Sequence, residues 1–197
     1  MARTYTQTRR AAQQAETRRR IVEAAVELHG SVGPAHTTVS MVAERAGVQR
    51  HTFYAHFPDE RSLFMACSGL ALERDPMPEA APLKTVKDRR ERLHAGLAAL
   101  YHWYERNAEL TACVLRDMEV HALTREVSEL RFGPIMAAYA EMLGAGLTAS
   151  QRAMLQLALS FSTWRILVRE SGLSRNAAVT AMVGAICGDD AKASKKG

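Results

Sequence analysis

A short stretch of the chain, residues 49–57, carries the side chains best suited to recognise another molecule. Phe53 and Phe57 are four residues apart, so in a helix they share the buried face while His51 and Ala55 point outward. The polar residues of the stretch are Gln49, Arg50, His51, Thr52, Tyr54 and His56. Such side chains donate hydrogen bonds to phosphate oxygens and to base edges. The chemistry predicted here is recognition of nucleic acid.

Patterns that would indicate catalysis are weak. Glu91 and His94 form an E-x-x-H pattern, as in di-iron helical bundles, but the second copy and the further carboxylates of such a site are missing. A G-x-G at Gly144–Gly146 follows a predicted helix, where a dinucleotide site requires a strand. The histidines show no metal-ligand pairs at a spacing of four. We therefore expect no enzyme, no cofactor and no metal.

The positive charge of the chain is concentrated near its beginning. The whole chain has a net charge of +5, and residues 1–20, with six arginines and one glutamate, account for +5 by themselves. Residues 21–75 sum to −3 and residues 76–197 to +3. Arginines near phosphates gain Coulomb energy and release counterions. The arm that holds Arg9 and Arg10 is a candidate polyanion contact, although a basic terminus that only favours solubility fits the charge equally well.

The composition predicts an all-α fold. The chain has 33 alanines, which favour helices, and only 12 glycines and 6 prolines. Three of the prolines lie between Pro76 and Pro82, where no helix can continue. This break divides the chain into a segment of about 75 residues and one of about 115 residues, each long enough to bury a core.

Four helices are expected in the first segment, over about residues 16–30, 38–47, 49–57 and from 58 onward. Thr38 is the predicted N-cap of the second helix. The second and third helices have the proportions of a helix-turn-helix, in which Gly47 adopts a positive φ and Val48 fills the wedge between them. A generic amphipathic helix pair gives the same pattern, so DNA reading and a plain helical hairpin both stay open on these residues alone.

Two stretches carry a resemblance to a known family. Residues 37–48, TTVSMVAERAGV, and residues 52–59, TFYAHFPD, resemble the N-terminal domain of the TetR family of transcriptional regulators. The resemblance covers about residues 16–72. It implies a homodimeric DNA-binding repressor with three N-terminal helices and a linking fourth. It also implies a larger C-terminal helical domain that binds a small effector and dimerises through its last two long helices.

Carried onto this chain, the family's groove-facing positions fall on Arg50, His51 and Thr52. Its phosphate contacts fall on Thr38, Ser40, Tyr54 and His56, and we add Gln49, Arg9 and Arg10 as candidate contacts. Two positions depart from the family pattern: Gln49 stands where a capping serine is common, and Glu60 stands where a lysine meets the DNA backbone. Glu60 would repel phosphate, so that contact depends on whether Arg61 replaces it.

The second segment is expected to form five helices, over about residues 84–106, 108–123, 126–146 with an interruption at Gly133-Pro134, 150–170 and 174–187. The stretch 150–170 is apolar on nearly every side, so it must be covered on two faces. The last helix has a small-residue face that allows close approach. The covering partner is therefore expected to be the same two helices, about 150–187, of a second subunit.

If the resemblance holds, an effector pocket lies among the helices of about residues 84–168. Its apolar walls with few polar groups would suit a hydrophobic or aromatic ligand. For most positions, however, an aromatic or methionine at helical spacing is more typical of a plain core than of a pocket. The candidate ligand-binding residues are Leu97, Tyr101, Tyr104, Cys113, Arg116, Met118, Met136, Tyr139, Phe161, Trp164 and Arg165.

The sequence also indicates where the protein works. Its three cysteines, Cys67, Cys113 and Cys187, are far apart and odd in number, so they predict reduced apolar fillers. No apolar run is long enough for a membrane span, and the first 30 residues lack a signal-type stretch. We expect a cytoplasmic protein that does not contact a membrane.

Together these observations predict a ligand-responsive, sequence-specific DNA-binding repressor that a small, largely hydrophobic effector releases from an inverted-repeat operator. The expected organisation is a basic flexible arm at 1–15, a helix-turn-helix DNA-binding domain with its linking helix at 16–75, an effector-binding and dimerisation domain at 76–190, and a disordered tail at 191–197. The expected partners are double-stranded operator DNA, the effector and a second copy of the chain. The alternative is a helical protein-interaction adaptor that does not read DNA.

Overall fold

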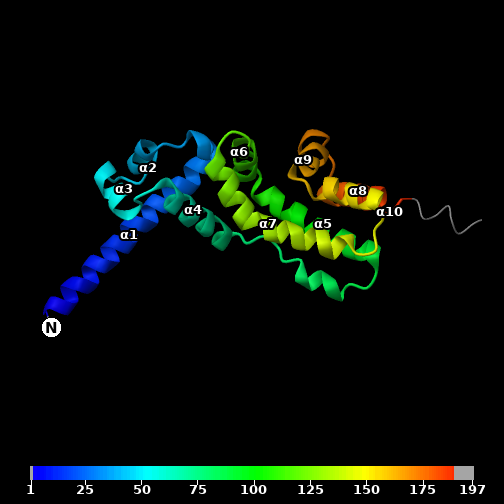
Figure 1. Cartoon of the computed structure of the whole chain (residues 1–197), viewed down its shortest axis with the longest axis horizontal. Helices are drawn as coiled ribbons and strands as arrows, with labels where there is room; N and C mark the ends of the chain where they lie inside the picture. The colour runs from blue at the N-terminus through cyan, green and yellow to red at the C-terminus, as the bar shows by residue number, and fades with distance from the viewer. Residues whose placement is uncertain (1, 189–197) are drawn as a thin grey trace, which may run out of the picture. The chain divides into compact units, whose positions relative to one another are not determined.

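The structure is a computed structural model that describes residues 2–188, with side chains from residue 7 onward. Helices and turns make up these residues, and no strand occurs among them. The α-helices are α1 (Ala2–Ser31), α2 (Val39–Arg45), α3 (Arg50–His56), α4 (Glu60–Arg74), α5 (Arg89–Arg106), α6 (Ala108–Met118), α7 (Ala122–Gly144), α8 (Ala149–Leu159), α9 (Phe161–Trp164) and α10 (Arg175–Cys187). Two short 3-10 helices, η1 (Pro34–His36) and η2 (Ala81–Thr85), and a π-helical turn, η3 (Arg165–Glu170), complete the set (Figure 1).

The chain divides into two compact units that are not contiguous in sequence. The N-terminal unit contains Met1–Pro76 together with Glu109–Arg131, and the C-terminal unit contains Met77–Ala108 together with Phe132–Gly197. The proline-rich break therefore marks one of three crossings between the units. The predicted division at residue 76 differs from the packing, because α6 and the first turns of α7 pack with the N-terminal helices. The functional assignment of the domains stays a prediction.

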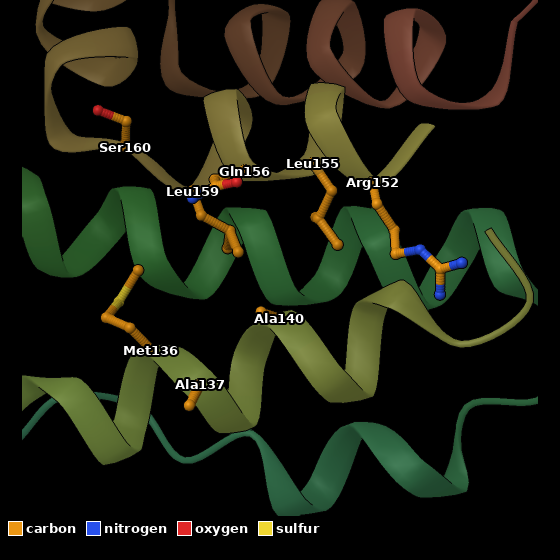
Figure 2. A pocket seen from close by; sticks show the side chains of 8 residues that line it. All are labelled: Met136, Ala137, Ala140, Arg152, Leu155, Gln156, Leu159 and Ser160. Carbon is orange, nitrogen blue, oxygen red and sulfur yellow. The ribbon is translucent and has the colours of Figure 1, made fainter. Parts of the chain in front are cut away.

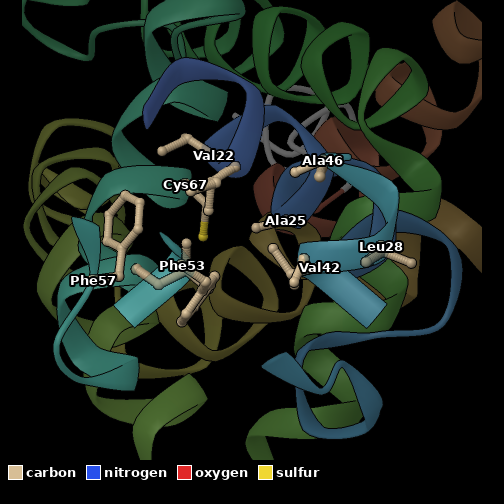
Figure 3. Packing of buried hydrophobic residues seen from close by; sticks show 12 residues of the cluster. Val22, Ala25, Leu28, Val42, Ala46, Phe53, Phe57 and Cys67 are labelled. Carbon is tan, nitrogen blue, oxygen red and sulfur yellow. The ribbon is translucent and has the colours of Figure 1, made fainter. Parts of the chain in front are cut away.

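The N-terminal unit is built around one core. Figure 3 shows residues of α1, α2, α3 and α4 meeting in it, with Phe53 and Phe57 beside Val22 and Cys67. Ile21, Ala25 and Phe57 in this cluster have no exposed surface. The helical spacing of these residues gives each helix one apolar face, and burying those faces against one another orders the helices.

Local signals set the ends of the short helices. The Thr38 hydroxyl accepts a hydrogen bond from the Met41 N–H at 3.3 Å, which confirms Thr38 as the N-cap of α2. Gly47 has a φ of 63°, so the turn between α2 and α3 needs the residue that adopts this conformation without strain. Val48 is half-buried against the core.

The beginning of the chain differs from the prediction. Residues 2–15, expected to be a flexible arm, continue α1 as a helix, and in Figure 1 these turns extend beyond the other helices of their unit. The side chains described here, from residue 7 to residue 16, are exposed. The predicted tail at 191–197 lies outside the described residues.

In the C-terminal unit, α5 packs along α10 and against α8, and α8 also packs against α10. Leu93, Leu97, Leu100 and Tyr101 on α5 have no exposed surface, as their spacing predicts. The helix begins at Arg89, five residues after the predicted start at 84, because the Asp88 carboxylate caps it by accepting the Glu91 N–H at 2.8 Å. Residues 81–85 form the separate turn η2 instead.

The single helix predicted over 150–170 is wrong. Ser160 has an extended backbone with a ψ of 135°, so α8 ends at Leu159, and the Ser160 hydroxyl accepts the Ser162 N–H to start α9. The Thr163 hydroxyl donates to the Leu157 carbonyl at 2.6 Å and fixes this corner. After Trp164 the backbone widens into η3. Conversely, α7 continues through Pro134, where an interruption was expected.

Candidate nucleic-acid interface and ligand cavity

The turn between α2 and α3 is held by backbone hydrogen bonds and by one arginine. The Gly47 N–H donates to the Glu44 carbonyl at 3.0 Å, and the Val48 N–H donates to the Ala43 carbonyl at 2.9 Å. The Arg20 guanidinium donates to the Gly47 carbonyl at 3.2 Å. The turn is therefore held from both α1 and α2.

α3 presents a polar face because its apolar residues are buried. Phe53 is 1% exposed and Phe57 is fully buried. Arg50, His51 and Ala55 are exposed, as predicted, and Tyr54 keeps 47% of its surface. Thr52 and His56 are half-buried. The groups that extend from α3 into solvent are thus a guanidinium, an imidazole and a phenol.

The remaining predicted contact residues flank this face. Thr38 and Ser40 are exposed at the start of α2, where the Thr38 hydroxyl accepts the capping hydrogen bond and can still donate its own proton. Gln49 is the N-cap of α3 but makes no side-chain capping bond, so its amide is available to a ligand. Arg9 and Arg10 are exposed on α1.

The arginines of α1 that follow the predicted arm have internal partners that the sequence did not indicate. The Arg18 guanidinium lies 4.2 Å from the centre of the Phe57 ring. Arg19 forms ion pairs with Glu16 and Glu23 on its own helix. Of the three arginines, Arg20 contacts the turn at Gly47, Arg18 contacts the end of α3, and Arg19 is paired within α1. Only the Arg19 pairs have a local signal, the spacing of three and four residues on one helix.

Arg61, the candidate replacement for the lysine that Glu60 displaces, already has a partner within the protein. The Arg61 guanidinium donates to the Glu126 carboxylate of α7, with Nε and Nη2 each within 2.9 Å of Oε1. Glu60 lies 4.0 Å from the His121 ring. Both partners of the Arg61–Glu126 pair are more than half exposed, so the pair is weak and can exchange with another anion.

A buried carboxylate joins α6 to the loop that precedes α2. Asp117 is 1% exposed, and it accepts hydrogen bonds from the Ala35 N–H at 2.8 Å and from the Arg116 guanidinium at 2.7 Å. Arg116 also donates to the Val32 carbonyl. These donors outweigh the burial of Asp117 and hold the pKa of its carboxyl below the ordinary value. Arg116 therefore serves the packing of the N-terminal unit.

The eleven predicted ligand-binding residues are divided between the two units. Cys113, Arg116 and Met118 belong to the N-terminal unit, and the other eight belong to the C-terminal unit. In the C-terminal unit, five of these residues are buried aromatic residues, Leu97 is also buried, and Arg165 is exposed. We call Tyr101, Tyr104, Tyr139, Phe161 and Trp164 the aromatic cluster. The Phe161 and Trp164 rings lie 5.4 and 6.0 Å from the Tyr104 ring.

A cavity of about 600 Å³ opens beside this cluster. Figure 2 shows it between α7 and α8, with Met136 pointing toward Leu159 and the Arg152 guanidinium at one end. Its lining residues are Met136, Ala137, Ala140, Arg152, Leu155, Gln156, Leu159 and Ser160. Met136 is the one predicted ligand-binding residue in this lining. The others were missed because the helix break at Ser160, which places them here, is hidden in an apolar run.

Comparison with known proteins decides the family of the N-terminal helices. Residues 21–67 match the family model described as bacterial regulatory proteins, tetR family. The N-terminal part of this chain is a TetR-family domain. The match covers the last part of α1, all of α2 and α3, and about half of α4, and these elements position the polar face of α3. The TetR-family fold supports a DNA-binding transcriptional regulator.

Solved structures extend the likeness to most of the chain. A transcriptional regulator from Rhodococcus sp. Rha1 is 19% identical over 86% of this chain and 95% of its own, with a TM-score of 0.60. A mutant of the HlyIIR protein is 16% identical over 87% and 97%, with a TM-score of 0.63. A TetR-family regulator from Streptomyces coelicolor is 16% identical over 91% and 85%, with a TM-score of 0.55. At these identities the likeness shows the fold.

The all-α TetR-family fold, with an N-terminal helix-turn-helix and a C-terminal helical domain, is thus confirmed. Ligand binding and dimerisation are typical of the family, and TetR-family regulators are generally non-enzymatic. No curated protein matches this chain. Among the described residues, no helix is both long and apolar enough to cross a membrane. The same residues contain no group of three or more His, Cys, Asp or Glu side chains that could hold a metal.

Proposed function

We propose that the chain is a transcriptional repressor that binds an inverted-repeat operator as a homodimer in the cytoplasm and leaves it when a small, largely hydrophobic effector binds. One observation carries the proposal: α3 presents Arg50, His51 and Tyr54 to solvent on a helix-turn-helix whose Phe53 and Phe57 are buried. The polar face of α3 is the part of the chain that would enter the major groove.

Each polar group would have a distinct task. Arg50 is the candidate for paired hydrogen bonds to a guanine, because a guanidinium matches the O6 and N7 acceptors of that base. Tyr54, Thr38 and Ser40 would hold phosphates through their hydroxyls, which fixes the register of α3 on the duplex. His51 and Thr52 would contact neighbouring base edges. Arg9 and Arg10 would add contacts to the DNA backbone.

A dimer is required for the operator to be long enough to be specific. Two copies of α3 about 34–36 Å apart would reach successive major grooves on one side of the DNA. The candidate dimer elements are the helices of residues 150–187. In the structure these are α8, α9, η3 and α10. Leu157 and Ile166, each about half exposed, are apolar residues of this region that a second subunit would cover.

α7 is the element that links effector and DNA in this proposal. Its residues 122–131 belong to the N-terminal unit, and its residues Met136, Ala137 and Ala140 line the cavity. Within the N-terminal unit, the Arg131 guanidinium donates to the Met65 carbonyl of α4 at 2.8 Å. A ligand that favours a different position of α7 would thereby shift α4 and α3, and derepression follows as a shift in population.

A mobility-shift assay with labelled DNA from the region flanking the gene for this chain tests the proposal. We expect a retarded complex that unlabelled copies of the same DNA remove and unrelated DNA does not. Small molecules extracted from the purified protein are then titrated against the complex. An absence of sequence-selective binding would overturn the regulator and favour the adaptor. Binding that no extracted or added compound weakens would overturn the effector response alone.

A further inference from the structure

Two buried polar groups in the aromatic cluster have no hydrogen-bond partner. Tyr139 and Trp164 are fully buried, and neither the Tyr139 hydroxyl nor the Trp164 indole N–H has a partner within the protein. By contrast, the Tyr101 hydroxyl donates to the Ala158 carbonyl at 2.9 Å, and the Tyr104 hydroxyl donates to the Leu159 carbonyl at 2.7 Å. Buried polar groups in proteins are nearly always paired, so two exceptions in one cluster need an explanation.

The two unpaired groups share the surroundings of Tyr104. The Trp164 ring lies 6.0 Å from the Tyr104 ring. Burial raises the pKa of Tyr104, and the hydroxyls of Tyr101 and Tyr139 lie near enough to add to this shift. Both groups can donate a hydrogen bond, and an indole N–H can only donate. The complement of such a pair is a hydrogen-bond acceptor on a molecule that fits among aromatic rings.

The cavity beside the aromatic cluster would give that molecule access to the cluster. Leu159 lines the cavity, and its carbonyl accepts the Tyr104 hydroxyl, so cavity and aromatic cluster share a wall at this residue. Met136 and Ala140, which line the cavity, flank Tyr139 on α7. The next lining residue, Ser160, forms the extended corner between α8 and α9, where its N–H donates to the Leu157 carbonyl and its own carbonyl accepts the Trp164 N–H.

The charge of the cluster decides which acceptors fit. None of its five residues is ionisable near neutral pH, and the cations nearby are exposed: Arg169 lies over the Trp164 ring at 5.6 Å, and Arg152 lies at the end of the cavity. A carboxylate held among these rings would lose its hydration without gaining a buried counter-charge, which costs far more than two hydrogen bonds return. A neutral acceptor oxygen avoids this cost.

We propose that the C-terminal unit binds a flat, neutral ring compound whose carbonyl or comparable acceptor oxygen takes hydrogen bonds from the Tyr139 hydroxyl and the Trp164 N–H. This proposal rests on the effector response proposed above and narrows the effector to a chemical class. The aromatic rings would contact the faces and edges of the ring compound. The two donors would distinguish it from a plain hydrocarbon of the same shape.

Three bicyclic probes test the class on the full-length protein by titration calorimetry: coumarin, with a carbonyl, naphthalene, with no acceptor, and 2-naphthoate, with a charge. We expect coumarin to bind at least about tenfold more tightly than either of the others, because one or two buried hydrogen bonds change affinity by about this factor. Equal binding of coumarin and naphthalene, preferred binding of 2-naphthoate, or no binding of coumarin would each overturn the proposal.

Matched tyrosine variants show whether the unpaired hydroxyl is responsible. Tyr139→Phe should leave the melting temperature of the free protein unchanged or raised, and should weaken coumarin binding about tenfold while leaving naphthalene binding unchanged. Tyr101→Phe is the control: it removes a paired hydroxyl, so it should lower the melting temperature and keep the preference for coumarin. Trp164→Phe should reduce the preference in the same way as Tyr139→Phe.

If Tyr139→Phe lowers the melting temperature as much as Tyr101→Phe, the Tyr139 hydroxyl has a partner in the free protein and the proposal is wrong. The mobility-shift assay separates this failure from failure of the proposed function. A wild-type protein that binds its operator and responds to another compound, but not to coumarin, retains the proposed function and loses the proposed class of effector.

Discussion

His29 is an ionisable residue buried in the core of the N-terminal unit. Its ring lies 4.9 Å from the Phe64 ring, and its Nδ1 lies 3.5 Å from the Cys67 sulfur. Burial lowers the pKa of His29 to about 4; the nearby Asp117 opposes this shift, and His121 adds to it. The folded protein therefore keeps His29 neutral at pH values at which the unfolded chain protonates it.

This difference predicts a loss of stability in mild acid. As the pH falls from about 6.5 to about 4, the unfolded chain takes up a proton that the folded protein does not, so the free energy of unfolding should fall by roughly 3 kcal/mol. Urea unfolding at a series of pH values measures it. His29→Leu should remove this part of the pH dependence, and the exposed control His51→Leu should not. If the free energy of unfolding depends on pH in the same way in His29→Leu and in the wild-type protein, the prediction is wrong.

Asp117 contributes a second effect at the residue scale. Asp117→Asn keeps the shape of the side chain but removes the charge that accepts the Ala35 N–H and the Arg116 guanidinium. Hydrogen bonds to a charged group contribute about 1.5–3 kcal/mol, and we expect a loss of that size in urea unfolding near neutral pH. The exposed Glu119→Gln should cost less than about 0.5 kcal/mol. Equal losses in the two variants would show that the buried carboxylate is not stabilising.

At the scale of elements, α3 separates positions that read bases from positions that hold the DNA backbone. Arg50→Ala should relax the preference at one base pair by roughly 1–3 kcal/mol, whereas Tyr54→Phe should weaken binding to all sequences about equally. Binding to a panel of single-base operator variants measures both. Both side chains are exposed, so the fold should not change. Uniform weakening by Arg50→Ala would assign Arg50 to a phosphate instead.

The ion pair between α4 and α7 leads to a prediction for Arg61. Glu126→Gln should free the Arg61 guanidinium from its carboxylate. If Arg61 then reaches a phosphate, DNA affinity should rise, and the slope of log affinity against log salt should steepen by about 1 for each subunit. Arg61→Ala should abolish this gain when combined with Glu126→Gln. An unchanged slope in Glu126→Gln would show that Arg61 does not replace the family's lysine.

The elements also show what the sequence could predict and why. The Thr38 cap, the Gly47 turn and the buried Phe53 and Phe57 depend on spacings of a few residues, and each was predicted. The bond from Ala35 to Asp117 joins residues 82 positions apart, and no local pattern indicates it. The corner at Ser160 was missed because apolar residues on both sides of it suit one long helix as well as two short ones.

In α7 the sequence predicts a helix break that the structure does not contain. Gly133 and Pro134 are typical helix breakers, yet the helix continues through them. Both residues are exposed, so water can replace the backbone hydrogen bond that proline cannot donate. Most of the cavity lining was missed for a related reason: the aromatic spacing identified buried residues, but the cavity is lined by residues whose placement depends on the corner at Ser160.

For the molecule as a whole, the charge distribution predicts how binding responds to salt. Residues 21–75, which include α2, α3 and α4, sum to −3, so phosphate attraction depends on the arginines of residues 1–20 and on a few placed side chains. Affinity for the operator should fall steeply with salt, and Arg9→Ala combined with Arg10→Ala should reduce the slope by up to about 2 for each subunit. Fluorescence anisotropy over a range of salt concentrations measures it. A flat dependence in the wild-type protein would contradict the role of α1.

The discontinuous N-terminal unit has a consequence for how the protein is made. Because Asp117 holds the loop before α2 and Arg131 holds Met65 in the middle of α4, the helix-turn-helix does not have all its supports when residue 76 has been synthesised. The last of them, Arg131, is synthesised about 55 residues later, a delay of several seconds at ordinary rates of translation. A nascent chain that ends near residue 80 should therefore be digested by protease more readily than one that ends beyond residue 160.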